Sequence, residues 1–223
     1  MAQPAVTIPG RAYRLDLRDA AMKRQTSRLL IVLLLSAAAG SGETAGRSGN
    51  TLGAEGANLL LNPSFEKPDH TGRLPADWVV FAVDGTARMR LTSEDVLDGE
   101  KSLAVRMLPR RGMVVGILSI LPVESSFRYD FSVHCKRASR RFSPGAGYIQ
   151  LVVEWLDGSG KELARSQSRR LPLAHLSRRR WKKLEIRRLR PPRGARNANF
   201  GVQFWPEGAR GEVYVDRAVV LVR

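Results

Sequence analysis

Residues 129–136 read Tyr-Asp-Phe-Ser-Val-His-Cys-Lys, with apolar and polar side chains in strict alternation. Successive side chains of a β-strand point to opposite faces of its sheet, so a period of two predicts a strand that is buried on one side only. The predicted core face carries Tyr129, Phe131, Val133 and Cys135, and His134 lies on the outward face. This single stretch already favours an antiparallel sheet with one face packed on a core.

The same alternation recurs in two later stretches, 148–155 and 200–205. The predicted core residues are Ile149, Leu151, Val153 and Trp155 in the first stretch, and Phe200, Val202 and Phe204 in the second. The large or polar side chains left on the outward faces are Tyr148, Gln150, Glu154, Gln203 and Trp205. A large aromatic side chain on the polar face of a sheet needs a reason, and a binding surface is one.

No helical period is sustained between residues 58 and 223, and Gly, Pro, Asp and Ser bound many short apolar runs. These signals predict short strands joined by turns. We expect strands at 58–61, 78–83, 87–93, 102–107, 113–121, 127–136, 147–156, 161–169, 182–189, 198–205 and 212–222. The predicted fold class is all-β, with 58–223 forming one antiparallel two-sheet β-sandwich.

The first 57 residues lack this pattern. A basic flank, the apolar run 29–35 and the small residues that follow it predict a secretory signal peptide within 1–39, and Met22 is a candidate for the true start. The apolar run is too short for a permanent membrane anchor. Residues 40–57 are small and polar, which predicts a flexible linker. We therefore expect a secreted protein, periplasmic or extracellular.

The chain is a basic protein, with 37 Lys and Arg against 21 Asp and Glu. Six of the basic and two of the acidic residues precede residue 40, so the remainder would still carry a net charge of +12. This charge favours an anionic partner, although a soluble basic surface gives the same composition. A single cysteine, Cys135, excludes an intramolecular disulfide and a cysteine-based zinc site. We expect Cys135 to be a buried thiol.

An ordered series of motifs spans 58–223. It opens with Asn58-Leu59-Leu60-Leu61-Asn62-Pro63-Ser64-Phe65-Glu66, continues through Trp78, Gly99-Glu100-Lys101-Ser102 and Trp155-Leu156-Asp157-Gly158-Ser159-Gly160, and closes with Val213-Tyr214-Val215-Asp216-Arg217. The series resembles the jelly-roll carbohydrate-binding modules found beside bacterial cellulases and xylanases, within the galactose-binding-like superfamily. The resemblance covers the whole predicted domain and is specific for the fold more than for the ligand.

The resemblance implies a glycan cleft on one sheet surface and a structural calcium ion. Aromatic rings stack on sugars, and amides and carboxylates bond to their hydroxyls. The predicted glycan-binding residues are Trp205, Tyr148, Gln150, Glu154, Gln203 and His134. The positions that match the calcium site are Glu66 and Asp216, but Arg217 stands where such modules often carry a second acidic residue. The implied partner is a polysaccharide, and the basic charge suits an acidic one.

The densest basic tract is Arg178-Arg179-Arg180-Trp181-Lys182-Lys183, and further arginines follow it up to Arg196. It fits a polyanion-binding stripe, but the favoured reading is a solvated edge strand protected by charge. No motif for specific nucleic-acid binding accompanies it.

His70, His134 and His175 are isolated, and no nucleophile elbow or paired carboxylates are evident, so we expect no enzyme. The main hypothesis is a monomeric, non-catalytic glycan-binding module. The alternatives are a jelly roll with a protein-interaction or structural role, and an unrecognised hydrolase or lyase.

Overall fold

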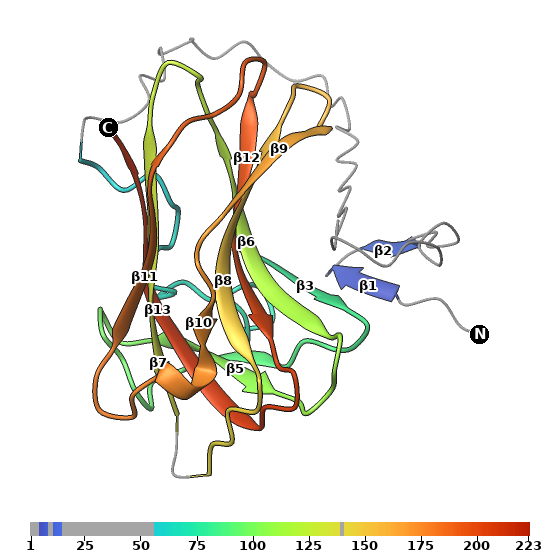
Figure 1. The fold of residues 1–223 in the computed structure, drawn as a ribbon, viewed down its shortest axis with the longest axis vertical. Coiled ribbons are helices and arrows are strands. Elements are labelled where there is room, and N and C mark those ends of the chain that lie inside the picture. Colours follow the sequence, from blue (N-terminus) through green and yellow to red (C-terminus); the bar gives the residue numbers. More distant parts are fainter. Residues whose placement is uncertain (1–4, 9–10, 15–55, 139–140) are drawn as a thin grey trace.

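The computed structural model describes residues 5–8, 11–14, 56–138 and 141–223. From residue 56 onward these residues form two antiparallel sheets that pack face to face (Figure 1). The predicted all-β class and the two-sheet sandwich are confirmed. The predicted signal peptide and linker fall almost entirely outside the described residues. Two short strands near the start, β1 (Ala5–Ile8) and β2 (Arg11–Arg14), pair with one another as a hairpin.

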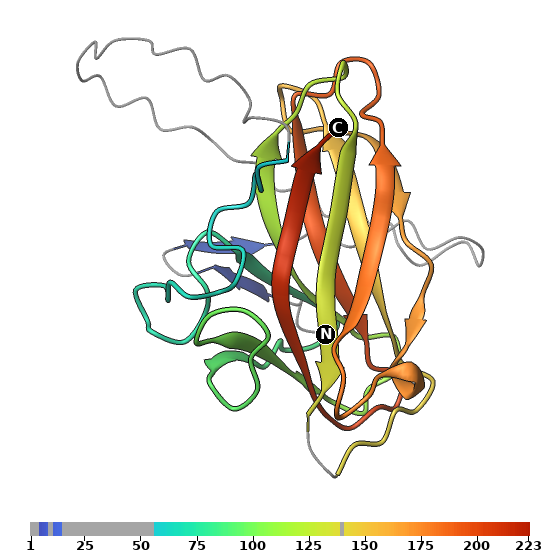
Figure 2. The same cartoon turned by 90° about the vertical axis from the view of Figure 1, so that its left-hand side faces the viewer.

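The first sheet runs, in order across it, β10 (Leu171–Pro172), β8 (Tyr148–Leu156), β12 (Asn197–Trp205), β6 (Val114–Pro122) and β3 (Val79–Val83), and β9 (Glu162–Gln167) also pairs with β8. The second sheet runs β11 (Lys182–Leu189), β7 (Tyr129–Arg137), β13 (Gly211–Val222), β5 (Ser102–Met107) and β4 (Met89–Thr92). A single 3₁₀ turn, η1 (Leu173–His175), follows β10. Figure 2 shows β13, β7 and β11 side by side on the face of the second sheet.

The core lies between the sheets and contains the residues that the alternation predicted. The side chains of Tyr129, Phe131, Val133 and Cys135 on β7 are fully buried, as are the predicted core residues of β8 and β12. Phe200 joins the sheets: its ring lies 5.5 Å from the ring of Phe131 and 6.2 Å from that of Trp155, centroid to centroid, and both contacts are edge-to-face. This geometry suits aromatic rings, whose edges are positive and faces negative.

The predicted first strand at 58–61 is reduced to one isolated bridge, between Asn58 and Leu221. Pro63 cannot donate a ladder hydrogen bond, and Asn62 and Phe65 have positive φ, so the chain turns away from the sheet edge. Asn58 nevertheless fixes the start of the domain on β13. Its Oδ1 accepts from Val220 N at 2.9 Å, and its Nδ2 donates to Ala218 O at 3.0 Å.

Candidate functional site

The outward face of β8 and β12 collects five of the six predicted glycan-binding residues. In the antiparallel register, Trp205 lies opposite Tyr148 and Gln203 lies opposite Gln150. Two residues further along each strand, Gly201 lies opposite Val152, and beyond this pair Asn199 lies opposite Glu154. Residues paired in this way point to the same side of a sheet, so these side chains form one surface, here called the β8–β12 face.

Two aromatic residues stand at one end of the β8–β12 face. The rings of Tyr148 and Trp205 stack with their centroids 5.5 Å apart, and Arg170 places its guanidinium carbon 4.5 Å from the centroid of the Tyr148 ring. Because β8 lies between β10 and β12, Arg170 and Trp205 approach Tyr148 from opposite sides. Burial raises the pKa of the Tyr148 hydroxyl, against the opposing effect of Arg170. Tyr148 therefore braces Trp205 and does not offer a ring face of its own.

Trp205 packs on its other flank against an apolar patch of the same outward surface, made by Phe81, Val114 and Leu118. Its indole Nε1 is buried and has no hydrogen-bond partner. An indole N–H normally finds a partner when it is buried, because an unpaired buried polar group costs about 1–3 kcal/mol. This orphan donor is thus a feature of the face that packing alone does not explain.

Polar side chains continue along the β8–β12 face, and each is less than a tenth exposed although it points away from the core. Gln150 Nε2 donates to Ser168 O at 2.8 Å. Asn199 Nδ2 donates to Glu154 Oε2 at 2.9 Å, whereas Asn199 Oδ1 is buried without a partner. Gln203 makes no side-chain hydrogen bond to any other described residue. The face therefore offers an unpaired donor, an unpaired acceptor and one uncommitted amide.

Glu154 is the buried carboxylate of the β8–β12 face. Its Oε1 pairs with Arg165 Nη2 at 2.9 Å, and the same nitrogen lies 2.8 Å from Glu162 Oε2. Burial raises the pKa of the Glu154 carboxyl, and the hydrogen bond from Asn199 and the charge of Arg165 oppose that rise. A guanidinium that binds both carboxylates holds Glu154 in a structural ion-pair network.

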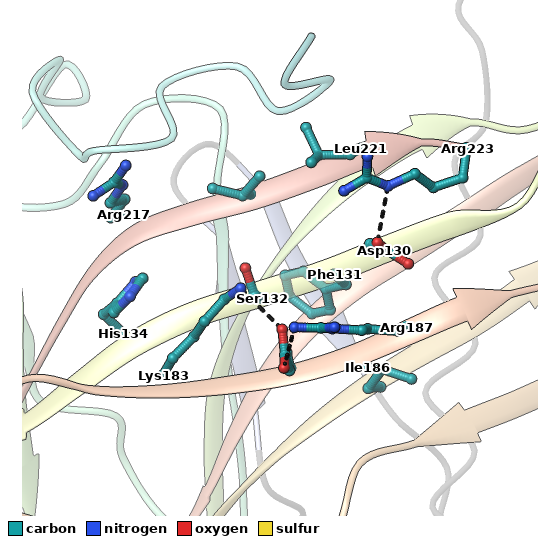
Figure 3. A pocket seen from close by; sticks show the side chains of 12 residues that line it. Asp130, Phe131, Ser132, His134, Lys183, Ile186, Arg187, Arg217, Leu221 and Arg223 are labelled. Carbon is teal, nitrogen blue, oxygen red and sulfur yellow. Dashed lines mark hydrogen bonds and ion pairs between the residues drawn. The ribbon is translucent and has the colours of Figure 1, made fainter. Parts of the chain in front are cut away.

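His134, the sixth predicted residue, lies on the second sheet and so does not belong to the β8–β12 face. It points outward from β7, between Lys183 of β11 and Asp216 of β13. It borders a groove of about 420 Å³, here called the β11–β13 groove, shown in Figure 3. Alternation predicted correctly that His134 faces away from the core, but it does not state which of two sheets a strand joins.

The residues implied for calcium, Glu66 and Asp216, do not fit that ion. Asp216 Oδ2 accepts from the backbone N–H groups of Leu97 and Asp98 at 2.7 and 3.1 Å, and Asp216 Oδ1 accepts from that of Arg217 at 2.6 Å. Burial raises the pKa of Asp216 to about 6, against these three hydrogen bonds.

Glu66 is engaged in a similar way at one of its two carboxylate oxygens. Its Oε1 accepts from the backbone N–H groups of Glu100 and Lys101, both at 2.9 Å. Calcium requires six to eight oxygen ligands, and these N–H donors point at the carboxylates where further oxygens would be needed. Across the described ranges, no group of three or more His, Cys, Asp and Glu side chains is placed to hold a metal ion.

The basic tract continues into an edge of the sandwich, because β11 is the outermost strand of the second sheet. Lys183 and Arg187 both pair with Glu185, at 2.9 Å each. A charged edge strand resists pairing with a second chain, as the edge-strand reading of the tract predicted.

The remaining tryptophans serve packing: Trp78 and Trp155 are buried in the core, and Trp181 packs beside Tyr214 on the second sheet.

Comparison with known proteins gives the fold and no closer relationship. Neither a protein family nor a curated protein sequence matches the chain. The chain is similar to the enzymatically active domain of tailspike protein 4 from bacteriophage CBA120, with a TM-score of 0.55 and 13% identity over 74% of this chain and 21% of that one. It is similar to carbohydrate-binding modules from the β-sandwich superfamily, with a TM-score of 0.52 and 16% identity over 70% of this chain and 61% of that one.

A xylan-binding domain from carbohydrate-binding module family 22 matches over 75% of this chain and 96% of that domain, with 19% identity and a TM-score of 0.50. The match thus spans nearly all of that domain, but only about a fifth of the tailspike chain. At these identities the comparisons establish the jelly-roll fold that the sequence motifs predicted. Among the described residues, no helix is long and apolar enough to cross a membrane.

Proposed function

We propose that this chain is a secreted, non-catalytic module that binds polysaccharide on the β8–β12 face. The observation that carries this proposal is the pair of orphan polar atoms on β12, Trp205 Nε1 and Asn199 Oδ1, which share the face with the stacked rings. One atom is a donor and the other an acceptor, and a sugar hydroxyl can serve either. A ligand hydroxyl at each would remove the cost of leaving it unpaired.

The shape of the face suits a chain-like ligand. Trp205 and Asn199 are six residues apart on one strand, which corresponds to about 20 Å at the rise of an antiparallel strand. The aromatic end supplies apolar surface, and Gln203 lies between the two orphan atoms with an uncommitted amide. A polysaccharide laid along β12 would contact the indole first and the amides after it.

The fold does not separate binding from catalysis, because a solved xylan-binding domain and an enzymatically active tailspike domain both share it. One observation of this chain favours binding. The buried carboxylate of the face, Glu154, is held by Arg165 and Asn199, whereas a glycosidase needs two carboxyl groups on either side of the scissile bond. Secretion is proposed from the sequence of residues 23–40 alone.

The test is binding of the purified protein to a panel of polysaccharides, with three variants of two tryptophans. Trp205→Ala should weaken binding at least several-fold, because it removes both the ring and its donor. Trp205→Phe keeps a ring but removes the N–H, so it should retain part of the affinity. Trp181→Ala is the matched control, since Trp181 is also partly buried but lies on the second sheet.

The result that contradicts the proposal is equally definite. If no polysaccharide binds, or if Trp205→Ala and Trp181→Ala bind as the parent protein does, the β8–β12 face is not a glycan site. The protein-interaction alternative then becomes the better account. Unchanged thermal unfolding of each variant must accompany the comparison, so that loss of binding is not loss of fold.

A further inference from the structure

The β11–β13 groove on the second sheet has a chemistry different from that of the β8–β12 face. Its walls carry four cationic side chains, from Lys183, Arg187, Arg217 and Arg223, against two carboxylates, from Asp130 and Glu185. The floor includes Ser132, Val219 and Leu221, and no aromatic ring is exposed in the groove for stacking. With His134 neutral, the groove has a net charge of +2.

The two ends of the groove differ, as Figure 3 shows. At one end Arg223 Nε pairs with Asp130 Oδ2 at 3.0 Å, so that charge is compensated. At the other end His134, Lys183 and Arg217 come together, and both cations act on the imidazole through their charge. Lys183 shares Glu185 with Arg187, whereas Arg217 is exposed and pairs with no acidic group in the described part of the chain.

The backbone directs Arg217 to this end of the groove. The ladder between β13 and β7 shifts register between Asp216 and Val219, which marks a β-bulge, and Arg217 has a φ of 49°. A bulge re-aims a side chain, and a non-glycine residue in the left-handed region persists only where the surroundings impose it. The strand thus departs from regular pairing at the residue that carries the uncompensated charge.

His134 adds an unused hydrogen-bonding atom at the same place. Its Nδ1 is buried and has no partner. Burial lowers the pKa of the imidazole and a hydrogen bond to the Arg217 backbone opposes this effect, but the charges of Arg217 and Lys183 lower the pKa further, so the ring is neutral at neutral pH. A neutral imidazole has one donor and one acceptor nitrogen, and the hydrogen bond to the Arg217 backbone uses the donor, so Nδ1 is an acceptor. A ligand that carries both hydroxyls and charged oxygens would satisfy this atom through a hydroxyl and the two cations through the charged oxygens.

We infer that the His134–Lys183–Arg217 end of the groove binds a carboxylate of an acidic polysaccharide, at a site separate from the β8–β12 face. A guanidinium and an ammonium bind carboxylate oxygens through charge-assisted hydrogen bonds. Only the choice of a glycan as the bearer of the carboxylate rests on the proposed function. A nucleic acid is disfavoured, because single strands are bound by basic grooves that also offer aromatic stacking.

The experiment measures binding of the purified protein to oligogalacturonate, a sulfated glycan and a single-stranded oligonucleotide. Oligogalacturonate should bind, and Arg217→Ala and Lys183→Ala should each weaken that binding by about tenfold or more. Arg110→Ala is the matched control: it removes one exposed positive charge from a turn outside the groove, and its effect should stay within about twofold. Binding of oligogalacturonate to Trp205→Ala is measured as well, to separate the groove from the β8–β12 face.

Several results would overturn the inference. They are a failure of oligogalacturonate to bind, an equal loss in Arg110→Ala, or preference for the sulfated glycan or the oligonucleotide. Loss of oligogalacturonate binding in Trp205→Ala would move the acidic ligand to the β8–β12 face. If neutral polysaccharides fail to bind but oligogalacturonate binds with the expected dependence on Arg217, the proposed function fails while this inference stands.

Discussion

Tyr148 and Trp205 are cross-strand neighbours on β8 and β12, and their rings are nearly parallel, with 13° between the planes. Arg170 covers the side of Tyr148 that Trp205 leaves open. We predict that Tyr148→Ala and Trp205→Ala are coupled in stability by about 0.5–1.5 kcal/mol, the range measured for aromatic pairs. A double-mutant cycle by urea unfolding gives this coupling.

The control for this cycle pairs Tyr148→Ala with Trp181→Ala. Trp181 lies on the second sheet and shares no partner with Tyr148, so the two effects should add. Coupling below about 0.3 kcal/mol between Tyr148 and Trp205 would mean that the ring contact contributes nothing beyond burial.

Cys135 gives a test of the core. Its side chain is fully buried on β7, and burial raises the pKa of the thiol to about 12. Only the thiolate reacts with disulfide reagents, and at pH 8 about one molecule in 10⁴ would carry it. We therefore expect Ellman's reagent to leave the native protein unmodified and to react with one thiol per chain in denaturant. In Ser126→Cys, with a cysteine in an exposed turn, one thiol should react at once. Rapid reaction of native Cys135 would contradict the assigned core.

The fold was predictable because alternation is a local signal. Tyr129, Phe131 and Phe200 could each be assigned to the core from their own strands, without knowledge of strand order. The sheet to which a strand belongs is a non-local property, and for that reason His134 was grouped with the wrong surface. Asn199 was accessible to the same reasoning, since it lies at even spacing from Gln203 and Trp205, yet its orphan oxygen appears only in three dimensions.

Local sequence patterns also could not predict which hydrogen bonds the site residues make. Nothing near Gln150 in the sequence indicates that its amide bonds to Ser168, eighteen residues later. Likewise Asp216 is occupied by the backbone of Leu97 and Asp98, well over one hundred residues earlier. Motif spacing identifies where such side chains lie, but hydrogen-bond partners from distant segments determine which atoms remain for a ligand.

Calcium should have no effect on stability. The backbone N–H groups of Leu97 and Asp98 already satisfy Asp216, so the site lacks the oxygen ligands that would favour the ion. A ligand at free concentration c that binds only the native state stabilises it by RT ln(1 + c/Kd) and so raises the melting temperature. We expect scans in excess chelator and in excess calcium to give the same melting temperature. If calcium raises the melting temperature of the parent protein but not that of Glu66→Gln, the ion binds at this site.

The pH dependence of stability should report on Glu154. Its side chain is nearly inaccessible, and burial raises the pKa of its carboxyl above the ordinary value of 4.5. The native state therefore keeps this proton to a higher pH than the unfolded state. Between 4.5 and the raised native pKa the native state binds more protons, so the contribution of Glu154 to the free energy of unfolding falls as pH rises.

Glu154→Gln replaces the carboxyl by an amide that does not titrate. The amide oxygen can still accept from Asn199, and Arg165 keeps Glu162 as a partner. Stability relative to the parent protein should therefore shift in favour of the variant as the pH of urea unfolding rises from about 4 to about 7. Asp216, whose pKa is also raised, is present in both proteins and cancels in the difference.

Glu100→Gln, at an exposed position, controls for the loss of one negative charge. If the two variants show the same pH dependence, desolvation of Glu154 does not outweigh its ion pair with Arg165.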